Sequence, residues 1–104
     1  MLCFVGVEFE FEDADLEDAY YDPRASVGHG PAADKGFRKV IGKIKAAKDE
    51  RDLRALKGLH YHKLAGNRSH QHALNLTDQW RLIVERIEEE GRTRLLIISV
   101  EDYH

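Results

Sequence analysis

The chain has 104 residues, a formal net charge of −3 and one cysteine, Cys3. That length suits a single domain and excludes a two-domain protein, and one cysteine excludes an internal disulfide. Residues 1–7 are apolar but lack the basic start of a secretory signal, and no segment is long enough to span a membrane, so a cytoplasmic location without a membrane partner is expected.

The charges are distributed unevenly along the chain. Residues 1–22 contain eight acidic residues and no Lys or Arg, whereas residues 23–68 contain twelve Lys or Arg and only four acidic residues. A basic middle of this kind suits a polyanion such as RNA, or an acidic protein partner. The alternative interpretation is the solvated face of a helix beside an acidic strand, which the charge pattern supports equally well.

The first part of the chain predicts a strand and a short helix. Apolar residues alternate with glycine and glutamate over residues 5–12, which is the pattern of a half-buried strand with its acidic side chains outward. Residues 13–21 predict a short helix, because Asp13 is a good N-cap and acidic residues fill the first turn, where the helix dipole favours them.

Two further helices are expected next. Pro31 suits the first position of a helix, and the helix that it opens extends to about Lys48. The apolar residues that recur at helical spacing and form its buried stripe are Phe37, Val40, Ile41, Ile44 and Ala47. Residues 49–57 predict a second, shorter helical segment that Gly58 ends.

The last third of the chain predicts three consecutive strands. Residues 71–76 form the first strand, and residues 77–79 form a turn, because a short Asx side chain can bond its own backbone. Residues 80–87 form the second strand, and residues 88–91 make a turn whose glycine adopts a positive φ. Residues 93–100 are apolar on both parities, which predicts a central strand.

This order of elements predicts an α+β domain that comprises the whole chain, residues 1–104. One strand comes first, the helices follow, and an antiparallel meander ends the chain. The helices are expected to pack on one face of a small antiparallel sheet. The last strand then delivers residues 102–104 to an edge of that sheet.

Four of the six histidines form two His-x-His pairs, His60 with His62 and His70 with His72. Residues two apart on a strand share a face, so each pair presents two nitrogen ligands, and a zinc site is one interpretation. No cysteine or carboxylate lies at a regular ligand spacing, which disfavours it. The second pair shares parity with Leu74, so a histidine hydrogen-bonded at the margin of the core is the favoured interpretation there.

Histidine can also transfer protons near neutral pH. Cleavage of a phosphodiester needs a base for the ribose 2′-hydroxyl, an acid for the leaving 5′-oxygen and cations against the charge that grows on the phosphate. The sequence offers two histidines and three cations for these roles: His62, His104, Lys63, Arg68 and Arg81.

Two prominent residues also have structural interpretations. Trp80 is expected to pack into the core, because large aromatic residues at the start of a strand usually point inward. Arg81 has an alternative to a catalytic role, as the ion-pair partner of Glu85 or Glu101 across neighbouring strands.

Three short motifs carry a resemblance to a known family. They are residues 62–68 (HKLAGNR), residues 78–82 (DQWRL) and the final residues 102–104 (DYH). Each motif is weak alone, but together they resemble the HigB branch of the RelE/ParE superfamily of toxins. The resemblance extends from about Gly36 to the end of the chain, and it implies a RelE-like fold.

The resemblance implies the toxin of a type II toxin–antitoxin system. Such toxins of the HigB type are mRNA interferases: ribosome-dependent, metal-independent endoribonucleases that inhibit translation and growth, and no cofactor is expected. The implied partners are the ribosome, mRNA and a cognate antitoxin that is HigA-like and of the helix-turn-helix type, with operator DNA as a ligand of the toxin–antitoxin complex. The competing interpretations are a ParE-like toxin that binds DNA gyrase without cutting nucleic acid, and a degenerate toxin.

The resemblance also implies roles for single residues. The candidate catalytic residues are His62, Arg81, Asp102, Tyr103 and His104. Within this set, His62 is the candidate acid or base and Arg81 the transition-state cation. The other three form a terminal catalytic cluster.

Three further residues are candidates for RNA binding: His60, Lys63 and Arg68. Relatives often carry a lysine where this chain has Ala65, so one phosphate-binding cation is either missing here or replaced by Lys63. The position of His62 is not uniformly histidine among proteins of this kind, which makes His60 the alternative catalytic histidine.

Overall fold

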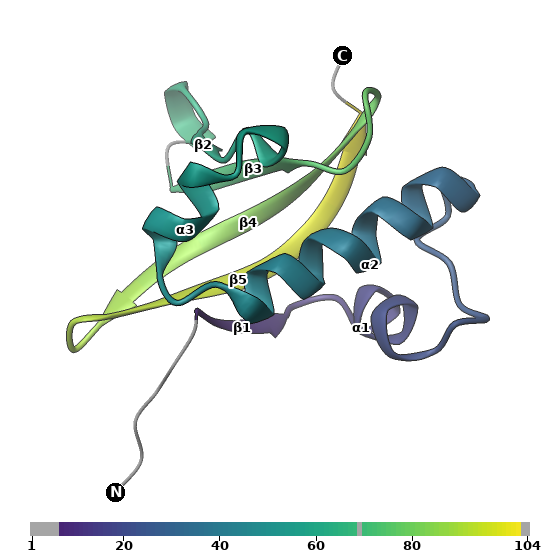
Figure 1. The fold of residues 1–104 in the computed structure, drawn as a ribbon, viewed down its shortest axis with the longest axis horizontal. Helices are drawn as coiled ribbons and strands as arrows, with labels where there is room; N and C mark the ends of the chain where they lie inside the picture. The colour runs from purple at the N-terminus through teal and green to yellow at the C-terminus, as the bar shows by residue number, and fades with distance from the viewer. Residues whose placement is uncertain (1–6, 69, 103–104) are drawn as a thin grey trace, which may run out of the picture.

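The computed structural model describes residues 7–68 and 70–102 and has an α+β fold (Figure 1). Its elements in chain order are β1 (Glu8–Phe11), α1 (Ala14–Tyr21), α2 (Pro31–Ala46), α3 (Glu50–Ala55), the 3₁₀ turn η1 (Lys57–Leu59), β2 (His62–Lys63), the 3₁₀ turn η2 (Gly66–Arg68), β3 (Gln71–Asn75), β4 (Trp80–Glu89) and β5 (Arg92–Asp102). None of the helices in these residues has the length and apolar character needed to cross a membrane. Cys3, Tyr103 and His104 lie outside the described residues.

The five strands form one sheet in the order β1-β5-β4-β3-β2. As predicted, β3, β4 and β5 form an antiparallel meander, and β5 lies inside the sheet between β1 and β4. The prediction of an antiparallel sheet is wrong for one pair, because β1 runs parallel to β5 and the sheet is mixed. A parallel pair requires a long crossover, which the helices and the meander between these two strands supply.

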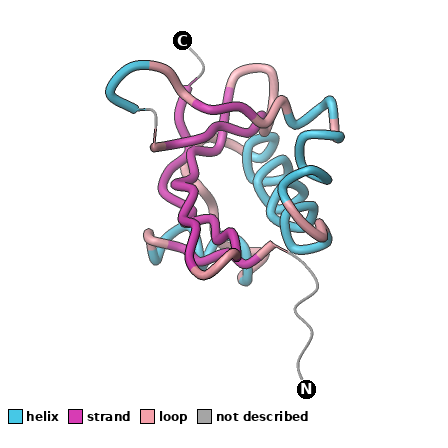
Figure 2. Tube along the Cα trace, turned by 90° about the vertical axis from the view of Figure 1, so that its left-hand side faces the viewer, coloured by secondary structure: helices cyan, strands magenta, loops and turns pink. Residues whose placement is uncertain are grey.

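The sheet has two different sides. α2 and α3 lie against one side, and α1 packs beside α2 near β1 (Figures 1 and 2). Residues opposite each other in neighbouring strands share a side, and the helix-facing side carries the buried residues Leu74, Leu82, Val84, Leu95 and Ile97. The other side is called the open face below. Two neighbouring rows of it bear on the site: Ala73, Ile83 and Ser99, then Asn75, Arg81 and Glu101.

Both turns of the meander differ in detail from their predictions. Between β4 and β5, the turn consists of Glu90 (φ 51°) and Gly91 (φ 77°), so β4 extends further than predicted. Positive φ at both turn positions matches the twist of the two strands. Between β3 and β4, the hydroxyl of Thr77, rather than an Asx side chain, accepts hydrogen bonds from the backbone N–H groups of Gln79 (3.2 Å) and Trp80 (3.0 Å).

The helices begin at the predicted residues. The Asp13 carboxylate caps α1 by accepting a backbone hydrogen bond of 2.8 Å, and Pro31 is the first residue of α2. The predicted end of α3 is wrong: the helix is capped by Leu56, and Gly58 lies beyond it in η1. The backbone N–H of Leu56 donates to the carbonyl of Leu53, so the last turn closes without a glycine.

Helix α2 comes very close to the sheet at Gly36. A Cβ atom added there would lie 2.5 Å from the backbone carbonyl oxygen of Leu76. Because backbone cannot move aside as a side chain can, we expect Gly36→Ala to lower the free energy of unfolding by about 1–3 kcal/mol in urea denaturation. Gly42→Ala is the control in the same helix: its Cβ meets nothing within 4 Å, and alanine should raise stability by about 0.5–1 kcal/mol. Equal effects of the two variants would contradict the close approach.

Candidate functional site

The open face brings predicted catalytic residues onto one side of the sheet. His62 of β2 lies opposite Ala73 of β3, which lies opposite Ile83 of β4. Arg81 is two residues from Ile83 on the same strand, so its side chain points to the same face as that of His62. The strand register therefore places a histidine and an arginine on the same side of the sheet.

A bulge in β5 adds a carboxylate to this surface. Ile83 pairs with Ser99, whereas Val84 pairs with Ile97, so the register shifts by one residue between them. The extra residue in β5 reverses the alternation of faces beyond it. Without the bulge, Glu101 would share the helix-facing side with Ile97, and with it Glu101 lies on the open face.

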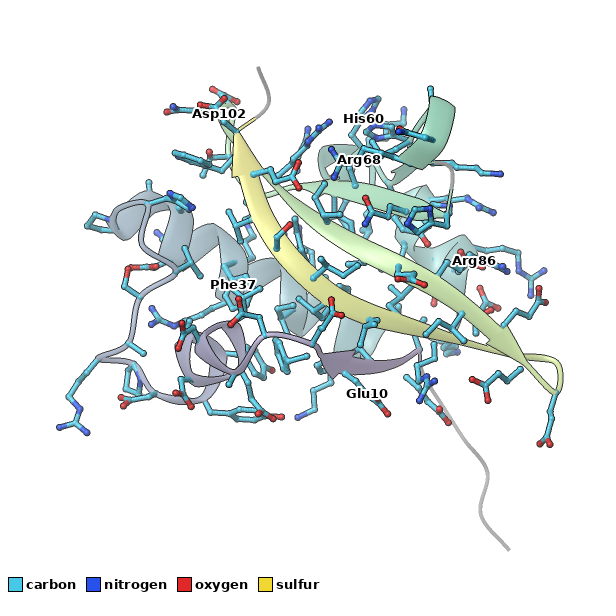
Figure 3. The ribbon with its side chains drawn as sticks, turned by 180° about the vertical axis from the view of Figure 1, so that it is seen from behind. Glu10, Phe37, His60, Arg68, Arg86 and Asp102 are labelled. Atoms are coloured by element: carbon cyan, nitrogen blue, oxygen red, sulfur yellow. The ribbon has the colours of Figure 1, made fainter. Side chains whose placement is uncertain are left out.

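Two arginines, Arg68 and Arg81, converge on Glu101. Arg68 is labelled in Figure 3. The guanidinium of Arg68 donates to both carboxylate oxygens at 3.1 and 2.9 Å, and Arg81 Nη2 lies 3.8 Å from Oε1. The hydroxyl of Ser99 donates to the same carboxylate at 3.2 Å. The hydrogen bonds from Arg68 hold the pKa of Glu101 below its usual value, against the opposing effect of partial burial. The alternative prediction of an Arg81–Glu101 ion pair is confirmed, and the ionised Glu101 partly neutralises both cations.

The local backbone orients the ring of His62. Its Nδ1 lies 2.7 Å from the backbone carbonyl oxygen of His60. A carbonyl only accepts hydrogen bonds, so the ring donates through Nδ1–H, and the neutral imidazole then keeps a lone pair on Nε2. His60 adopts a left-handed backbone conformation (φ 47°), which directs its carbonyl to this ring. The turn at His60 therefore selects the tautomer in which His62 accepts a proton at Nε2.

Asp102 lies on the other side of the sheet from Arg81. It pairs with Trp80 in the register, and its carboxylate accepts a hydrogen bond from Gln79 Nε2 at 3.3 Å. Trp80 stacks on His29, with ring centroids 4.0 Å apart and 18° between the ring planes. The predicted packing of Trp80 into the core is wrong, because the start of β4 reaches the rim of the helix layer, where the exposed His29 covers the half-buried indole. The register therefore places Asp102 and Arg81 on opposite sides of the sheet.

The second histidine pair lies away from the open face. His72 is 6% exposed and stacks on Tyr61 with ring centroids 4.9 Å apart, which confirms its predicted position at the margin of the core. Its Nδ1 has no hydrogen-bond partner in the described part of the chain, so the predicted hydrogen bond is wrong for that nitrogen. Burial lowers the pKa of His72. His70 is exposed, and Lys63, which lies opposite His72, points to the helix-facing side.

A buried ionic network was not predicted from the sequence. Glu50 is 9% exposed and accepts hydrogen bonds from the Tyr61 hydroxyl (2.8 Å) and Arg86 Nε (2.7 Å). Burial raises the pKa of Glu50, but the hydrogen bonds from Tyr61 and Arg86 outweigh it and leave the pKa below its usual value. Arg54 lies 3.9 Å from the same carboxylate. The i,i+4 spacing of Glu50 and Arg54 was the one signal in the sequence, because the remaining partners are distant along the chain.

The positions of His60 and His62 test the interpretation of a zinc site. The rings of His60 and His62 lie 4.6 Å apart. Within residues 7–68 and 70–102, however, no group of three or more His, Cys, Asp or Glu side chains is placed to hold a metal ion.

Comparison with known proteins identifies a similar structure. A solved structure described as "YoeB/ParE toxin from Agrobacterium tumefaciens" superposes with a TM-score of 0.55 at 11% sequence identity, over 94% of this chain and 100% of that chain. No protein-family model matches the sequence, and no curated protein does. At this identity the likeness concerns the fold, and it confirms the predicted fold class: the chain has a RelE/ParE-like α+β fold.

Proposed function

We propose that this chain is the toxin of a type II toxin–antitoxin system and cuts mRNA on the ribosome. The observation that carries the proposal is the shared position of His62, Arg68 and Arg81 on the open face of a RelE/ParE-like fold. A proton acceptor on the same face as two cations provides the kinds of group that cleavage of RNA by its own 2′-hydroxyl requires. The HigB-like motifs of the sequence support two further parts of the proposal: that cleavage takes place on the ribosome, and that it needs no metal cofactor.

In the proposed reaction, His62 Nε2 removes the proton of a ribose 2′-hydroxyl, whose oxygen then attacks the adjacent phosphorus. The bond from phosphorus to the 5′-oxygen breaks, which leaves a 2′,3′-cyclic phosphate on one fragment and a 5′-hydroxyl on the other. Arg81 stabilises the charge that develops on the phosphate oxygens. Of the terminal cluster, Tyr103 and His104 are proposed to supply the acid that protonates the leaving oxygen. Asp102, on the other side of the sheet from Arg81, is assigned no proton transfer at this site.

The remaining candidates, His60, Lys63 and Arg68, are proposed to bind the RNA strand. Arg68 lies on the open face, whereas Lys63 points to the helix-facing side at the β2 edge, so a strand that contacts both passes around that edge. A HigA-like, helix-turn-helix antitoxin is the proposed protein partner, and the cytoplasm is the proposed location.

A ParE-like toxin that binds DNA gyrase without cutting nucleic acid is the second candidate. The similar structure from Agrobacterium tumefaciens carries the names of both toxin types. The observation that favours this candidate is the engagement of Arg68 and Arg81 with Glu101, since a paired arginine has less charge to offer to a phosphate.

Expression from a tightly controlled promoter distinguishes the two candidates. The wild-type chain is expected to arrest growth and to create new mRNA 5′ ends within translated codons, and the double variant Arg81→Ala, His104→Ala is expected to lose both effects. Arg94→Ala is the matched control, because Arg94 is also a strand arginine but pairs with Glu10 (2.9 Å) and Glu89 (3.0 Å). Growth arrest without new 5′ ends, unchanged in the double variant, would exclude the nuclease and favour the gyrase-binding toxin.

Glu101 is expected to oppose the binding of RNA to the open face. Glu101→Gln removes the negative charge between Arg68 and Arg81 but keeps the shape of the side chain. We expect tighter binding of single-stranded RNA, and a salt dependence of log K that steepens by about 0.7 for each additional phosphate that the protein neutralises. Fluorescence anisotropy titrations at several salt concentrations provide the measurement. Weaker binding by the variant would mean that Glu101 chiefly positions the two arginines.

A further inference from the structure

A second basic site lies on the opposite side of the sheet from Arg81. It is a pocket of about 300 Å³ between α3 and the β2 edge, and its lining residues are Arg54, Lys63, His70, His72 and Arg86. Lys63 lies opposite His72, and Arg86 binds Glu50 of α3, which places the pocket on the helix-facing side. Every lining side chain is a cation or an imidazole.

The charges around this pocket leave an excess of positive charge. Arg86 pairs with Glu50 at 2.7 Å and with Glu88 at 3.4 Å, and Arg54 lies 3.9 Å from Glu50. Lys63 forms no ion pair with any residue that the structure describes. The three cations Arg54, Lys63 and Arg86 are therefore balanced by only two carboxylates, Glu50 and Glu88, and Glu50 is buried. An anion that enters the pocket meets a net attraction.

Several side chains of the pocket are held in place before any ligand arrives. Glu50 fixes Arg86 through a hydrogen bond of 2.7 Å, and the guanidinium of Arg54 lies over the ring of Tyr61, 5.7 Å from its centroid. His72 is buried against the same ring. Cations that are already ordered lose less conformational entropy on binding, so the pocket is preorganised for a compact anion.

We propose that this pocket binds a phosphate group of single-stranded RNA. A phosphate is compact, anionic and rich in acceptor oxygens, and it suits the guanidinium of Arg54 beside the ammonium of Lys63. The adjacent residues His62 and Lys63 of β2 point to opposite sides of the sheet. A strand that bends around the β2 edge therefore places one phosphate in the pocket and another on the open face. This inference rests on the proposed function, because it takes RNA as the ligand, and an acidic protein segment is the competing occupant.

The first test titrates the full chain with inorganic phosphate and follows backbone amide resonances by NMR. The resonances of Lys63, His70 and Arg86 are expected to shift, and Arg54→Gln is expected to weaken the effect. The Arg54 side chain is 57% exposed, so its replacement should leave the fold intact. Arg51→Gln is the matched control, because it removes the same charge from the same helix at a side chain that is 88% exposed and outside the pocket. The absence of shifts, or equal weakening in both variants, would overturn the proposal.

The second test replaces phosphate with oligouridylate. For Arg54→Gln, the slope of log K against log salt is expected to fall by about 0.7, the amount for one phosphate of a single strand that is no longer neutralised, and Arg51→Gln should leave the slope unchanged. If a polyglutamate peptide shifts the pocket resonances and the RNA does not, the pocket belongs to an acidic protein partner and the RNA assignment is wrong. Both tests measure binding alone, so absence of mRNA cleavage in cells would contradict the proposed function and leave the result for the pocket standing.

Discussion

Glu50→Gln is expected to destabilise the protein by about 1–3 kcal/mol, because it removes the buried countercharge of the half-buried Arg86 and leaves Arg86 only its exposed partner Glu88. The carboxylate accepts hydrogen bonds from both Tyr61 and Arg86 and joins α3 to β4. The amide of glutamine keeps the size of the side chain but carries no charge, so the loss is electrostatic rather than steric. Urea denaturation of the wild type and the variant provides the measurement.

Glu88→Gln is the matched control for this prediction. Glu88 also pairs with Arg86, at 3.4 Å, but its side chain is 59% exposed. Exposed ion pairs contribute at most about 1 kcal/mol, so this variant should stay close to the wild type. Comparable losses in the two variants would mean that burial of the Glu50 carboxylate does not govern the strength of the network.

The Glu50 network also predicts how stability depends on pH. The folded state holds the pKa of Glu50 below its unfolded value of 4.5. Its contribution is therefore present in full above the unfolded pKa and is lost as the pH falls through the lower, folded pKa. The difference in stability between wild type and Glu50→Gln should accordingly shrink in acid. A difference that stays constant from neutral pH to acid would contradict this linkage.

His62→Gln is expected to reduce mRNA cleavage by about 10²–10⁴-fold, the usual contribution of a positioned general base. The hydrogen bond from Nδ1–H to the His60 carbonyl leaves Nε2 as the proton acceptor, and glutamine has no group that takes a proton near neutral pH. The measurement is the rate of cleavage of a defined mRNA by purified protein on ribosomes. Thermal unfolding of the variant checks that the fold is intact.

His60→Asn separates the two candidate catalytic histidines. Asparagine tolerates the left-handed backbone of this position (φ 47°) and keeps the carbonyl that orients His62. We therefore expect a much smaller loss of cleavage than for His62→Gln. The reverse order of the two variants would assign the catalytic role to His60.

Local chemistry made most elements of the fold predictable from the sequence. The Asp13 cap, the proline at the start of α2 and the apolar run of β5 each act over a few residues. The parallel pairing of β1 was missed, because alternation identifies a strand but says nothing about its neighbour or direction. The Thr77 turn was located correctly but assigned to the wrong side chain, since both Thr and Asp can bond a turn backbone.

The sequence predicted which residues belong to the candidate site, but it did not predict on which side of the sheet each of them lies. His62 and Arg81 share the open face because of the pairing of three strands, which no local pattern contains. The one-residue bulge in β5 places Glu101 on the open face beside Arg81 and places Asp102 on the helix-facing side. Pairing between strands sets this shift, so it became visible only in the folded structure.

The most direct test of the proposed function supplies the purified chain with ribosomes that carry a defined mRNA. We predict cleavage of the mRNA only when ribosomes are present, with a 2′,3′-cyclic phosphate and a 5′-hydroxyl at the cut, and we expect Arg81→Ala to abolish the cut while Arg94→Ala does not. Intact mRNA under these conditions, together with inhibition of DNA supercoiling by gyrase in a parallel assay, would contradict the proposed nuclease and assign the chain to the gyrase-binding toxins.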